Sequence, residues 1–212
     1  MKIEKFVLGP VMTNTYIVYD ENTKKGVIFD PADEGEILLD YIEREKLIIK
    51  YILLTHGHFD HIGAVKYLTE HLNIPYFIHK KDLDFIKNAD ISAKHFGLKI
   101  ENPPLQNNFV KEGDKFNIGE FSISVLETPG HSQGSVSYLI KEENNKIIIS
   151  GDLIFKGNIG RVDLPGGDFN TLLSSVRKKI FPLGNDTVIL PGHEGETTIA
   201  AEKKFNPYFR GK

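Results

Sequence analysis

Cysteine is absent from the 212-residue chain, and this absence excludes several kinds of chemistry. Without thiols there are no disulfides, no thiolate ligands for a metal ion and no cysteine nucleophile. Any metal ion would have to be held by histidine, aspartate or glutamate. Such ligands favour zinc, iron, manganese or cobalt over calcium or magnesium, because imidazole is a borderline-soft donor. The absence of cysteine also fits a reducing compartment, and we expect a cytoplasmic protein.

The chain also lacks long apolar runs and a strong excess of charge of one sign. No stretch approaches the roughly 20 apolar residues of a membrane-spanning helix, and the first ten residues have no apolar core of the kind found in secretory signals. The formal net charge is −3, with acidic and basic residues mixed along the sequence. We therefore expect a small-molecule substrate, no nucleic acid partner and no membrane, and a monomer or a homodimer.

Apolar segments alternate with turn signals along the whole chain, without a linker or a shift in composition. This organisation favours a single domain over residues 1–212. Hairpin-like pairs of strands and strand–helix pairs both occur, which predicts an α/β domain with a mixed sheet and outer helices. The strand-like segments are 3–8, 16–19, 26–30, 49–54, 75–78, 121–126, 135–140, 147–150 and 188–190, and the helix-like segments are 34–45, 62–72, 80–88, 169–180 and 198–205.

Four of the strand-like segments are followed within a few residues by a side chain that can bind a metal ion. Leu-Leu-Thr leads to His56, Thr-Pro-Gly to His131, Ile-Ile-Ile-Ser-Gly to Asp152 and Leu-Pro-Gly to His193. In layered α/β proteins, the loops at one edge of the sheets gather into a common crevice. We therefore expect the four loops to converge on one site.

The densest group of such side chains lies in the loop after residue 54. His56, His58, Asp60 and His61 fall within six positions of a chain that contains 8 histidines. Helix capping could account for Asp60, but it does not account for three imidazoles beside it. Four ligand-type residues exceed what one tetrahedral zinc ion takes from a single loop. The surplus predicts two metal ions, each bound by some of the ligand-type residues of this loop.

A second motif in the chain points to a different chemistry. Residues 130–134, Gly-His-Ser-Gln-Gly, match the nucleophile elbow of α/β-hydrolases, and Asp152 and His193 follow Ser132 in the expected order. The elbow requires a helix after the turn, whereas Ser-Val-Ser-Tyr-Leu-Ile is typical of a strand. We therefore predict that Ser132 is not a nucleophile and forms a hydrogen bond near the ligand loop.

The order His-x-His-x-Asp-His, then a distant histidine, a distant aspartate and a final histidine, resembles the signature of the metallo-β-lactamase superfamily. The resemblance covers essentially the whole chain. It implies an αββα four-layer sandwich of two mixed sheets with outer helices, and a site at one edge between the sheets. By this resemblance the first metal ion would be held by His56, His58 and His131, the second by Asp60, His61 and His193, and both would be bridged by Asp152.

Within the superfamily the chain is similar to the glyoxalase II group, the hydroxyacylglutathione hydrolases. The similarity lies in residues 151–155, 160–167, 190–193, 197–199 and 202–207, which include Gly-Arg-Val-Asp-Leu-Pro-Gly-Gly and Leu-Pro-Gly-His. Full-length glyoxalase II has a C-terminal helical domain that grips glutathione, whereas 19 residues follow His193 here. The resemblance is therefore to the short members without that domain. It implies hydrolysis of a thioester such as S-lactoylglutathione or a related S-acyl thiol.

The expected chemistry follows from two cations that share one water. Divalent cations about 3.5–4 Å apart lower the pKa of a shared water to near 7, and the resulting bridging hydroxide can attack a carbonyl carbon. A thiolate leaves without a strong general acid, because its parent thiol has a pKa of roughly 8.5. We expect two divalent ions, with zinc as the first choice and iron or manganese as alternatives. Asp60 has a second predicted role as a catalytic residue that orients the hydroxide.

Several further residues have weaker predicted roles. Asp30 and Asp163 are candidates to accept the second N–H of a ligating imidazole. Arg161 is a candidate to bind a carboxylate or phosphate of the substrate, although an ion pair with Asp163 explains it equally well. Residues 90–107 form a longer polar excursion that fits either a lid or a surface insert.

Three other functions stay open at this point. A mononuclear iron persulfide dioxygenase is similar in its Gly-Arg-x-Asp stretch, which corresponds to residues 160–163. A lactonase or another ester hydrolase of the same fold needs no additional domain, whereas a nuclease would need a basic groove that the sequence lacks. A metal-binding scaffold without activity is the third alternative, and the intact set of ligand-type residues argues against it.

Overall fold

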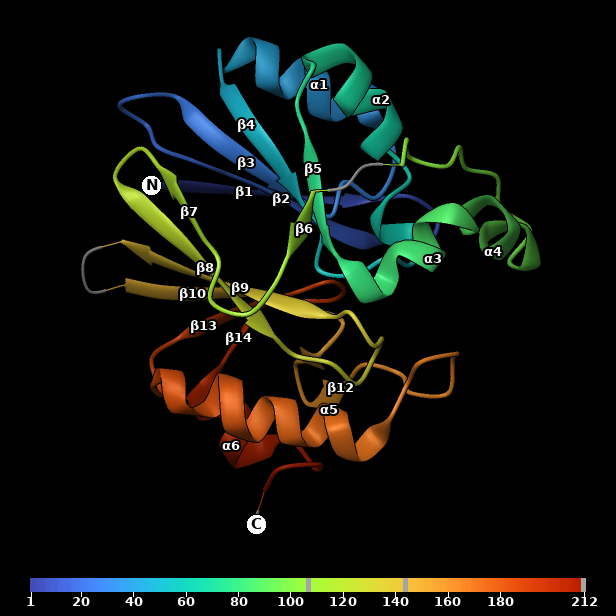
Figure 1. The fold of residues 1–212 in the computed structure, drawn as a ribbon. Helices are drawn as coiled ribbons and strands as arrows, with labels where there is room; N and C mark the ends of the chain where they lie inside the picture. Colours follow the sequence, from blue (N-terminus) through green and yellow to red (C-terminus); the bar gives the residue numbers. More distant parts are fainter. Residues whose placement is uncertain (106–107, 143–144, 211–212) are drawn as a thin grey trace.

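Two six-stranded sheets lie face to face in the computed structural model, which describes residues 1–105, 108–142 and 145–210 (Figure 1). The order of the first sheet is β1-β2-β3-β4-β5-β6, and that of the second is β14-β13-β10-β9-β8-β7. The first sheet comprises β1 (Lys2–Leu8), β2 (Thr13–Tyr19), β3 (Lys25–Phe29), β4 (Ile48–Leu53), β5 (Tyr76–His79) and β6 (Phe109–Val110). The second comprises β7 (Lys115–Ile118), β8 (Phe121–Glu127), β9 (Val136–Glu142), β10 (Asn145–Gly151), β13 (Val188–Pro191) and β14 (Thr197–Thr198).

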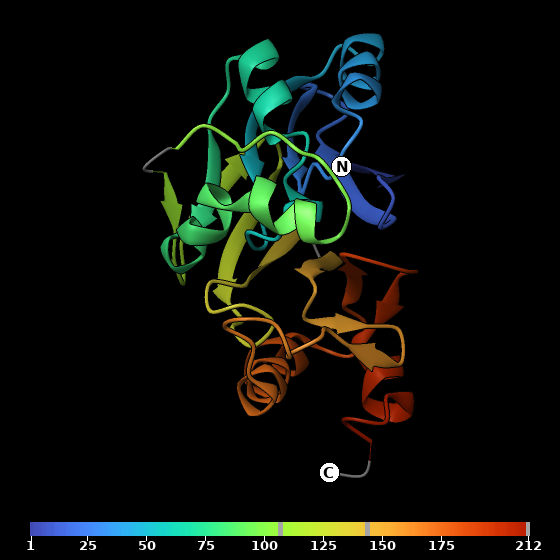
Figure 2. The ribbon, with the colours of Figure 1, turned by 90° about the vertical axis from the view of Figure 1, so that its right-hand side faces the viewer.

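Helices cover the outer face of each sheet. The helices α1 (Gly35–Arg44) and α2 (Val65–Leu72) lie over the first sheet, and α5 (Phe169–Ser175) and α6 (Ile199–Phe205) lie over the second (Figure 1). Two short helices, α3 (Leu83–Lys87) and α4 (Ala89–His95), lie at one edge of the sandwich and face the viewer in Figure 2. The two mixed sheets with outer helices confirm the predicted αββα sandwich.

Side chains that alternate between the two faces of each sheet form three layers of hydrophobic core. In β2, Tyr16 and Val18 point into the space between the sheets, whereas Ile17 packs toward the first pair of helices. Successive side chains of a strand point to opposite faces, so a strand with core on both sides is buried throughout, as β2 is. Leu172 of α5 and Ile148 of β10 belong to the third layer, on the far side of the second sheet.

The sheet topology places the predicted ligand loops at one edge. The strands β8, β10 and β13 run in the same direction, because β8 and β10 are both antiparallel to β9 and β10 is parallel to β13. The loops after these three strands therefore leave the same edge of the second sheet. The N–H of Val136 donates to the carbonyl of Thr55 over 2.8 Å, which brings the loop after β4 of the first sheet to that edge.

The helices differ from the expected ones in several places. The helix expected over 169–180 is α5 up to Ser175 and continues as a π-helix over Val176–Ile180. The helix expected from residue 62 begins at Val65, because the N–H of Ala64 donates to the carbonyl of Pro31. The helix expected over 80–88 is split into a 3-10 turn at Lys80–Asp82 and α3. The 90–107 excursion begins in α4, which the sequence did not predict as a helix, while residues 106–107 lie outside the described residues.

No helix within the described residues is long and apolar enough to cross a membrane.

Tyr138 of β9 connects the two sheets next to the first ligand loop. Its buried hydroxyl donates to the carbonyl of Leu54 over 2.8 Å. We expect Tyr138→Phe to lower the free energy of unfolding by about 1–2 kcal/mol, because a buried carbonyl loses its partner. Urea denaturation of the metal-free protein measures this loss. Tyr67→Phe is the matched control, since the described residues give the Tyr67 hydroxyl no hydrogen bond; an equal effect of both substitutions would contradict the assignment.

Candidate metal centre

Seven side chains from four loops meet at the edge where the two sheets approach each other. His56 and His58 follow β4, and the next residues form a 3-10 turn, Phe59–His61, that carries Asp60. The remaining members are His61 on the same turn, His131 after β8, Asp152 after β10 and His193 after β13. These are the seven residues that the sequence singled out, and the structure brings all of them together. Their role as metal ligands stays a prediction.

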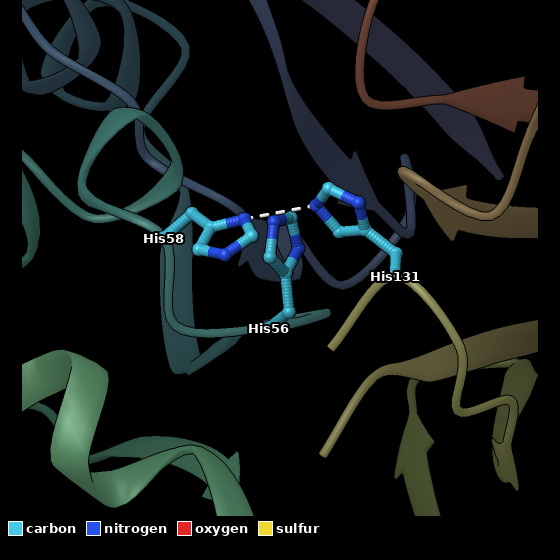
Figure 3. A group of neighbouring side chains, drawn as sticks. All are labelled: His56, His58 and His131. Carbon is cyan, nitrogen blue, oxygen red and sulfur yellow. Dashed lines mark hydrogen bonds between the residues drawn. The ribbon is translucent and has the colours of Figure 1, made fainter. Parts of the chain in front are cut away.

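The first group consists of three imidazoles that converge on one point. Each of His56, His58 and His131 offers a ring nitrogen, and the three nitrogens lie within 4.8 Å of one another. Nδ1 of His58 and Nε2 of His131 are 2.8 Å apart, and the rings stand nearly perpendicular, at 89° (Figure 3). Three nitrogens that face a common centre leave one side of a tetrahedron open, which is the geometry of a catalytic zinc site.

The second group combines one carboxylate and two imidazoles. Oδ2 of Asp60 lies 3.4 Å from Nε2 of His193 and 3.7 Å from Nε2 of His61. These atoms also lie within 4.8 Å of one another. The group is arranged to hold a second cation next to the first.

Asp152 lies between the two groups. Its Oδ1 is 3.4 Å from Nε2 of His61, and its Oδ2 is 3.6 Å from Nε2 of His131 and 3.5 Å from Nε2 of His193. One carboxylate therefore reaches a member of each group. This position fits the predicted bridge between two cations.

Hydrogen bonds behind the imidazoles fix which nitrogen each ring presents. Oδ2 of Asp30 accepts from the Thr55 hydroxyl at 2.6 Å and from Nδ1 of His61 at 3.0 Å. Since the Thr55 hydroxyl donates to Asp30, its oxygen accepts from Nδ1 of His56, 3.0 Å away. Nδ1 of His131 donates to the carbonyl of Arg161 over 2.8 Å. The three rings therefore present Nε2 as a lone-pair donor toward the centre.

Several buried polar atoms at the centre lack a hydrogen-bond partner among the described residues. They include Nε2 of His56, Nε2 of His61 and Oδ1 of Asp152. An unsatisfied buried polar group costs about 1–3 kcal/mol, so a folded protein rarely gathers several in one place without a ligand. Imidazole nitrogens and carboxylate oxygens are suitable ligands for zinc, iron or manganese. The donor set therefore fits two divalent cations.

The charges within the centre are unevenly divided. Burial and the neighbouring imidazoles lower the pKa of His58 to about 3 and lower the pKa of His56 well below its usual value. Burial also opposes charge on His193, but bonding to Asp152 and Asp60 outweighs it and raises its pKa to about 9. The two carboxylates thus already favour positive charge at the second group, where a cation would lie.

Asp82 is an important buried acid that the sequence did not reveal. Its Oδ2 accepts from the N–H of Gly57 at 3.1 Å and from the hydroxyl of Ser132 at 2.6 Å, and its Oδ1 accepts from the N–H of Gly134 at 2.7 Å. The carboxylate therefore ties the loop of His58 to the loop after β8. In the sequence, Asp82 lies in the polar run Lys-Lys-Asp, which is typical of a solvated surface.

The hydrogen bond to Asp82 also argues against Ser132 as a nucleophile. Ser132 donates to this carboxylate, and its loop leads into the strand β9 rather than into the helix that a nucleophile elbow requires. The hydrogen bond predicted for Ser132 near the ligand loop is confirmed.

Asn14 of β2 holds the loop of the last histidine and was also missed. Its N–H donates to the carbonyl of Gly192 over 2.7 Å, and its amide group donates to the carbonyls of Pro191 and Glu194 at 2.9 Å and 3.0 Å. The residue before it, Thr13, donates to Oδ2 of Asp60 over 3.3 Å. A polar pair in a strand has no distinctive spacing, so the sequence contained no signal for this role.

The two predicted supporting acids have different positions. Asp30 contacts the ligand set directly, as its hydrogen bond to His61 shows. Asp163 forms two hydrogen bonds with the guanidinium of Arg161 instead, at 2.8 Å and 2.9 Å. Of the two explanations for Arg161, the structure contains the ion pair with Asp163. Its contact with substrate stays a prediction.

A cavity of about 510 Å³ opens beside the seven side chains. Five of them line it, together with Arg161 and a largely apolar wall that includes Phe85 and Phe96. Its volume lies within the range of 300–1,000 Å³ that is typical of small-molecule sites. The candidate centre is therefore accessible to a small substrate.

Comparison with known proteins gives a consistent result. The family model described as the metallo-beta-lactamase superfamily matches residues 8–193. The chain is 39% identical over its full length to the probable metallo-hydrolase YqgX of Bacillus subtilis, of which it covers 99%. It is 36% identical to the hydroxyacylglutathione hydrolase GloC of Haemophilus influenzae, with all of both chains covered.

Solved structures also resemble this one over nearly their whole length. The crystal structure of the B3 metallo-beta-lactamase BLEG-1 has a TM-score of 0.91 and 39% identity, with 99% of this chain and 100% of that chain covered. The structure of TTHA1623 in a di-iron-bound form has a TM-score of 0.86 and 38% identity, with 97% and 99% covered.

Asp30 provides a test of the hydrogen bonds behind the imidazoles. We expect Asp30→Asn to weaken metal binding at both groups about 10- to 100-fold, because one amide oxygen cannot accept all the donors that the carboxylate now accepts. Competition with a chromophoric chelator measures the two affinities. Asp84→Asn is the control, since the Asp84 side chain is 86% exposed. Unchanged affinities in Asp30→Asn would refute the role of this carboxylate.

Asn14 provides a separate test for the second group. We expect Asn14→Ala to weaken the binding of one of two metal ions about 10-fold or more and to leave the other nearly unchanged, because only the loop of His193 loses two hydrogen bonds from the amide group. Metal content after dialysis, determined by mass spectrometry, should fall from two ions toward one. The exposed Asn170 supplies the control substitution Asn170→Ala. Equal loss of both ions would contradict a role confined to the second group.

Proposed function

Because the chain belongs to the metallo-beta-lactamase superfamily, we propose that it is a dinuclear metal-dependent hydrolase that cleaves thioesters. The family supports a metal-dependent hydrolase, and the full-length similarity to a hydroxyacylglutathione hydrolase supports a thioester as the substrate. S-lactoylglutathione or another S-acyl thiol is the kind of substrate that this similarity suggests.

The observation that carries the proposal is the shortage of proton donors in the cavity. Apart from the predicted ligands, Arg161 is the one ionisable side chain among the described residues that line it. A guanidinium stays charged at all ordinary pH values and is a poor general acid. An amine must be protonated as it leaves, whereas a thiolate, from a thiol of pKa roughly 8.5, needs no strong acid. The site is therefore better suited to thioesters than to amides.

The residues of the centre have distinct roles in this reaction. Two divalent cations, when bound, acidify a water and polarise the carbonyl oxygen of the substrate. His56, His58 and His131 would hold one cation, and Asp60, His61 and His193 the other, with Asp152 shared between them. Thr13 donates a hydrogen bond to Asp60, which fixes the carboxylate that we propose as the group orienting the attacking water.

The metal identity belongs to the same proposal. Imidazole and carboxylate ligands suit zinc, and they also suit iron and manganese. We propose zinc, and the di-iron form of the similar TTHA1623 makes iron the alternative to be tested.

The proposed function predicts metal-dependent release of thiol. We expect the purified protein to bind two metal ions and to hydrolyse a panel of S-acyl thiols, to lose activity with a chelator and to regain it with zinc. Asp152→Ala should lower the rate more than about 100-fold, because the loss of a shared ligand should exceed the cost of losing an outer hydrogen bond. Thiol release is measured with a disulfide reagent, with Asn170→Ala as the control. One bound iron with oxygen uptake and no thiol release would refute the proposal.

A further inference from the structure

The cavity beside the predicted metal ligands is walled by aromatic rings. Phe59, Phe85, Phe96 and Phe155 all line it, and Leu164 lies on the same wall. Phe85 stands edge-on to the ligand-type imidazole of His58, with ring centroids 4.8 Å apart. The apolar surface therefore begins directly beside the position where a scissile carbonyl would lie.

Away from the predicted metal ions, the cavity wall offers little to a charged group of the substrate. The guanidinium of Arg161 is the one cationic group, outside the predicted ligands, among its described lining residues. Two of its N–H groups already donate to the Asp163 carboxylate. Moving an ionised group from water to an apolar wall without a partner is costly. The wall is thus unfavourable for the carboxylates of a peptide-like thiol and favourable for hydrocarbon.

Part of this apolar wall is exposed to water at the mouth of the cavity. Phe96 is 54% exposed and Val11 is 41% exposed, and both line the cavity. The ring of Phe96, directly after α4, packs against that of Phe59, with centroids 5.2 Å apart, so the end of α4 is anchored beside the ligand turn with Phe96 at the opening. Large exposed apolar side chains that border a pocket are typical of a binding surface.

The apolar surface continues beyond the first cavity. A second cavity of about 470 Å³ lies along α3 and α4 and shares Phe85, Ser92 and Pro165 with the first. Most of its exposed surface is apolar and includes Ile91, which is 53% exposed, while Lys81, Asp84 and His95 also line it. A lactoyl group has three carbons and would fill a small part of this space. The two cavities adjoin at these three shared residues.

We propose that the preferred substrate of this site carries an apolar chain of several carbons, attached to the scissile carbonyl, which lies along the phenylalanine wall toward α4. The proposal rests on the proposed hydrolytic function and specifies its substrate class. The chain belongs either to the acyl group or to the leaving group, since both flank the same carbonyl. The experiment separates these two cases.

Two series of thioesters test the proposal with the zinc-loaded protein. In the first, straight acyl groups of two to eight carbons are attached to one small thiol; in the second, acetyl is attached to alkyl thiols of two to eight carbons. We expect kcat/KM to rise about threefold for each added methylene in one series until the cavity is filled, because each methylene leaves water. S-lactoylglutathione should be a poorer substrate than the best long-chain compound. Flat or falling values in both series would overturn the proposal.

Two variants locate the chain. Phe96→Ala should reduce the gain per methylene, and Ser92→Trp should shorten the chain length at which kcat/KM stops rising, because Ser92 lies between the cavities. Phe205→Ala is the matched control, since Phe205 is 64% exposed on α6 and lines neither cavity. Unchanged profiles in both cavity variants would place the chain elsewhere and overturn the proposal.

Calorimetry separates this inference from the proposed function. Binding of straight-chain carboxylates from acetate to octanoate is measured on the zinc-loaded protein without any turnover. We expect affinity to rise about threefold for each methylene, and Phe96→Ala to reduce that rise. Chain-dependent binding without hydrolysis of any thioester would retain the apolar site and refute the hydrolase. Hydrolysis of thioesters with an affinity and a rate that do not depend on chain length would retain the hydrolase and refute the apolar site.

Discussion

The carboxylate of Asp30 is the constraint on which the candidate centre most depends. It accepts the hydroxyl of Thr55 and the ring N–H of His61, and through Thr55 it also determines which nitrogen His56 presents. One buried acid therefore orients an imidazole from each group. The backbone N–H of Thr55 donates to the same carboxylate over 2.7 Å, so the ligand loop is tied to the end of β3. Ligand orientation and sheet packing are thus coupled, and neither can change without the other.

The fold could be predicted well from the sequence because its strands have a clear pattern of burial. β2 and β10 contain runs of apolar residues, and each is followed by a turn or by ligand-type residues. Five strands were not predicted. One is β7, whose four residues Lys-Phe-Asn-Ile form a single short apolar/polar alternation, and the others are the two-residue strands β6, β11 (Ile154–Phe155), β12 (Asn158–Ile159) and β14. Two residues are too few to show a period, and such strands exist because neighbouring strands supply their hydrogen bonds. Helix α4 was missed because its apolar residues Ala89, Ile91 and Ala93 alternate with polar ones and show no helical period.

The seven ligand-type residues could be predicted, whereas part of their support could not. Four of them are crowded into residues 56–61, and the others follow recognisable strand ends. Asp82 and Asn14 act through backbone groups of other loops, at separations of up to 180 residues. Apart from the Ser132 hydroxyl, their partners are backbone N–H and carbonyl groups, so no residue type marks these contacts in the sequence. Such contacts become visible only when the tertiary structure brings the loops together.

The site separates its chemical part from the part that would select a substrate. The ligand-type residues lie in loops that follow the ends of central strands. Buried carboxylates such as Asp30 and Asp82 restrain these loops by hydrogen bonds. The phenylalanine wall is built largely by segments outside the central strands, including α3 and α4, which cover one edge of the sandwich. A rigid element positions reacting groups precisely, and a peripheral segment can vary without disturbing them. Substitutions in α4 could therefore change which chains fit the cavity while the predicted metal ligands keep their geometry.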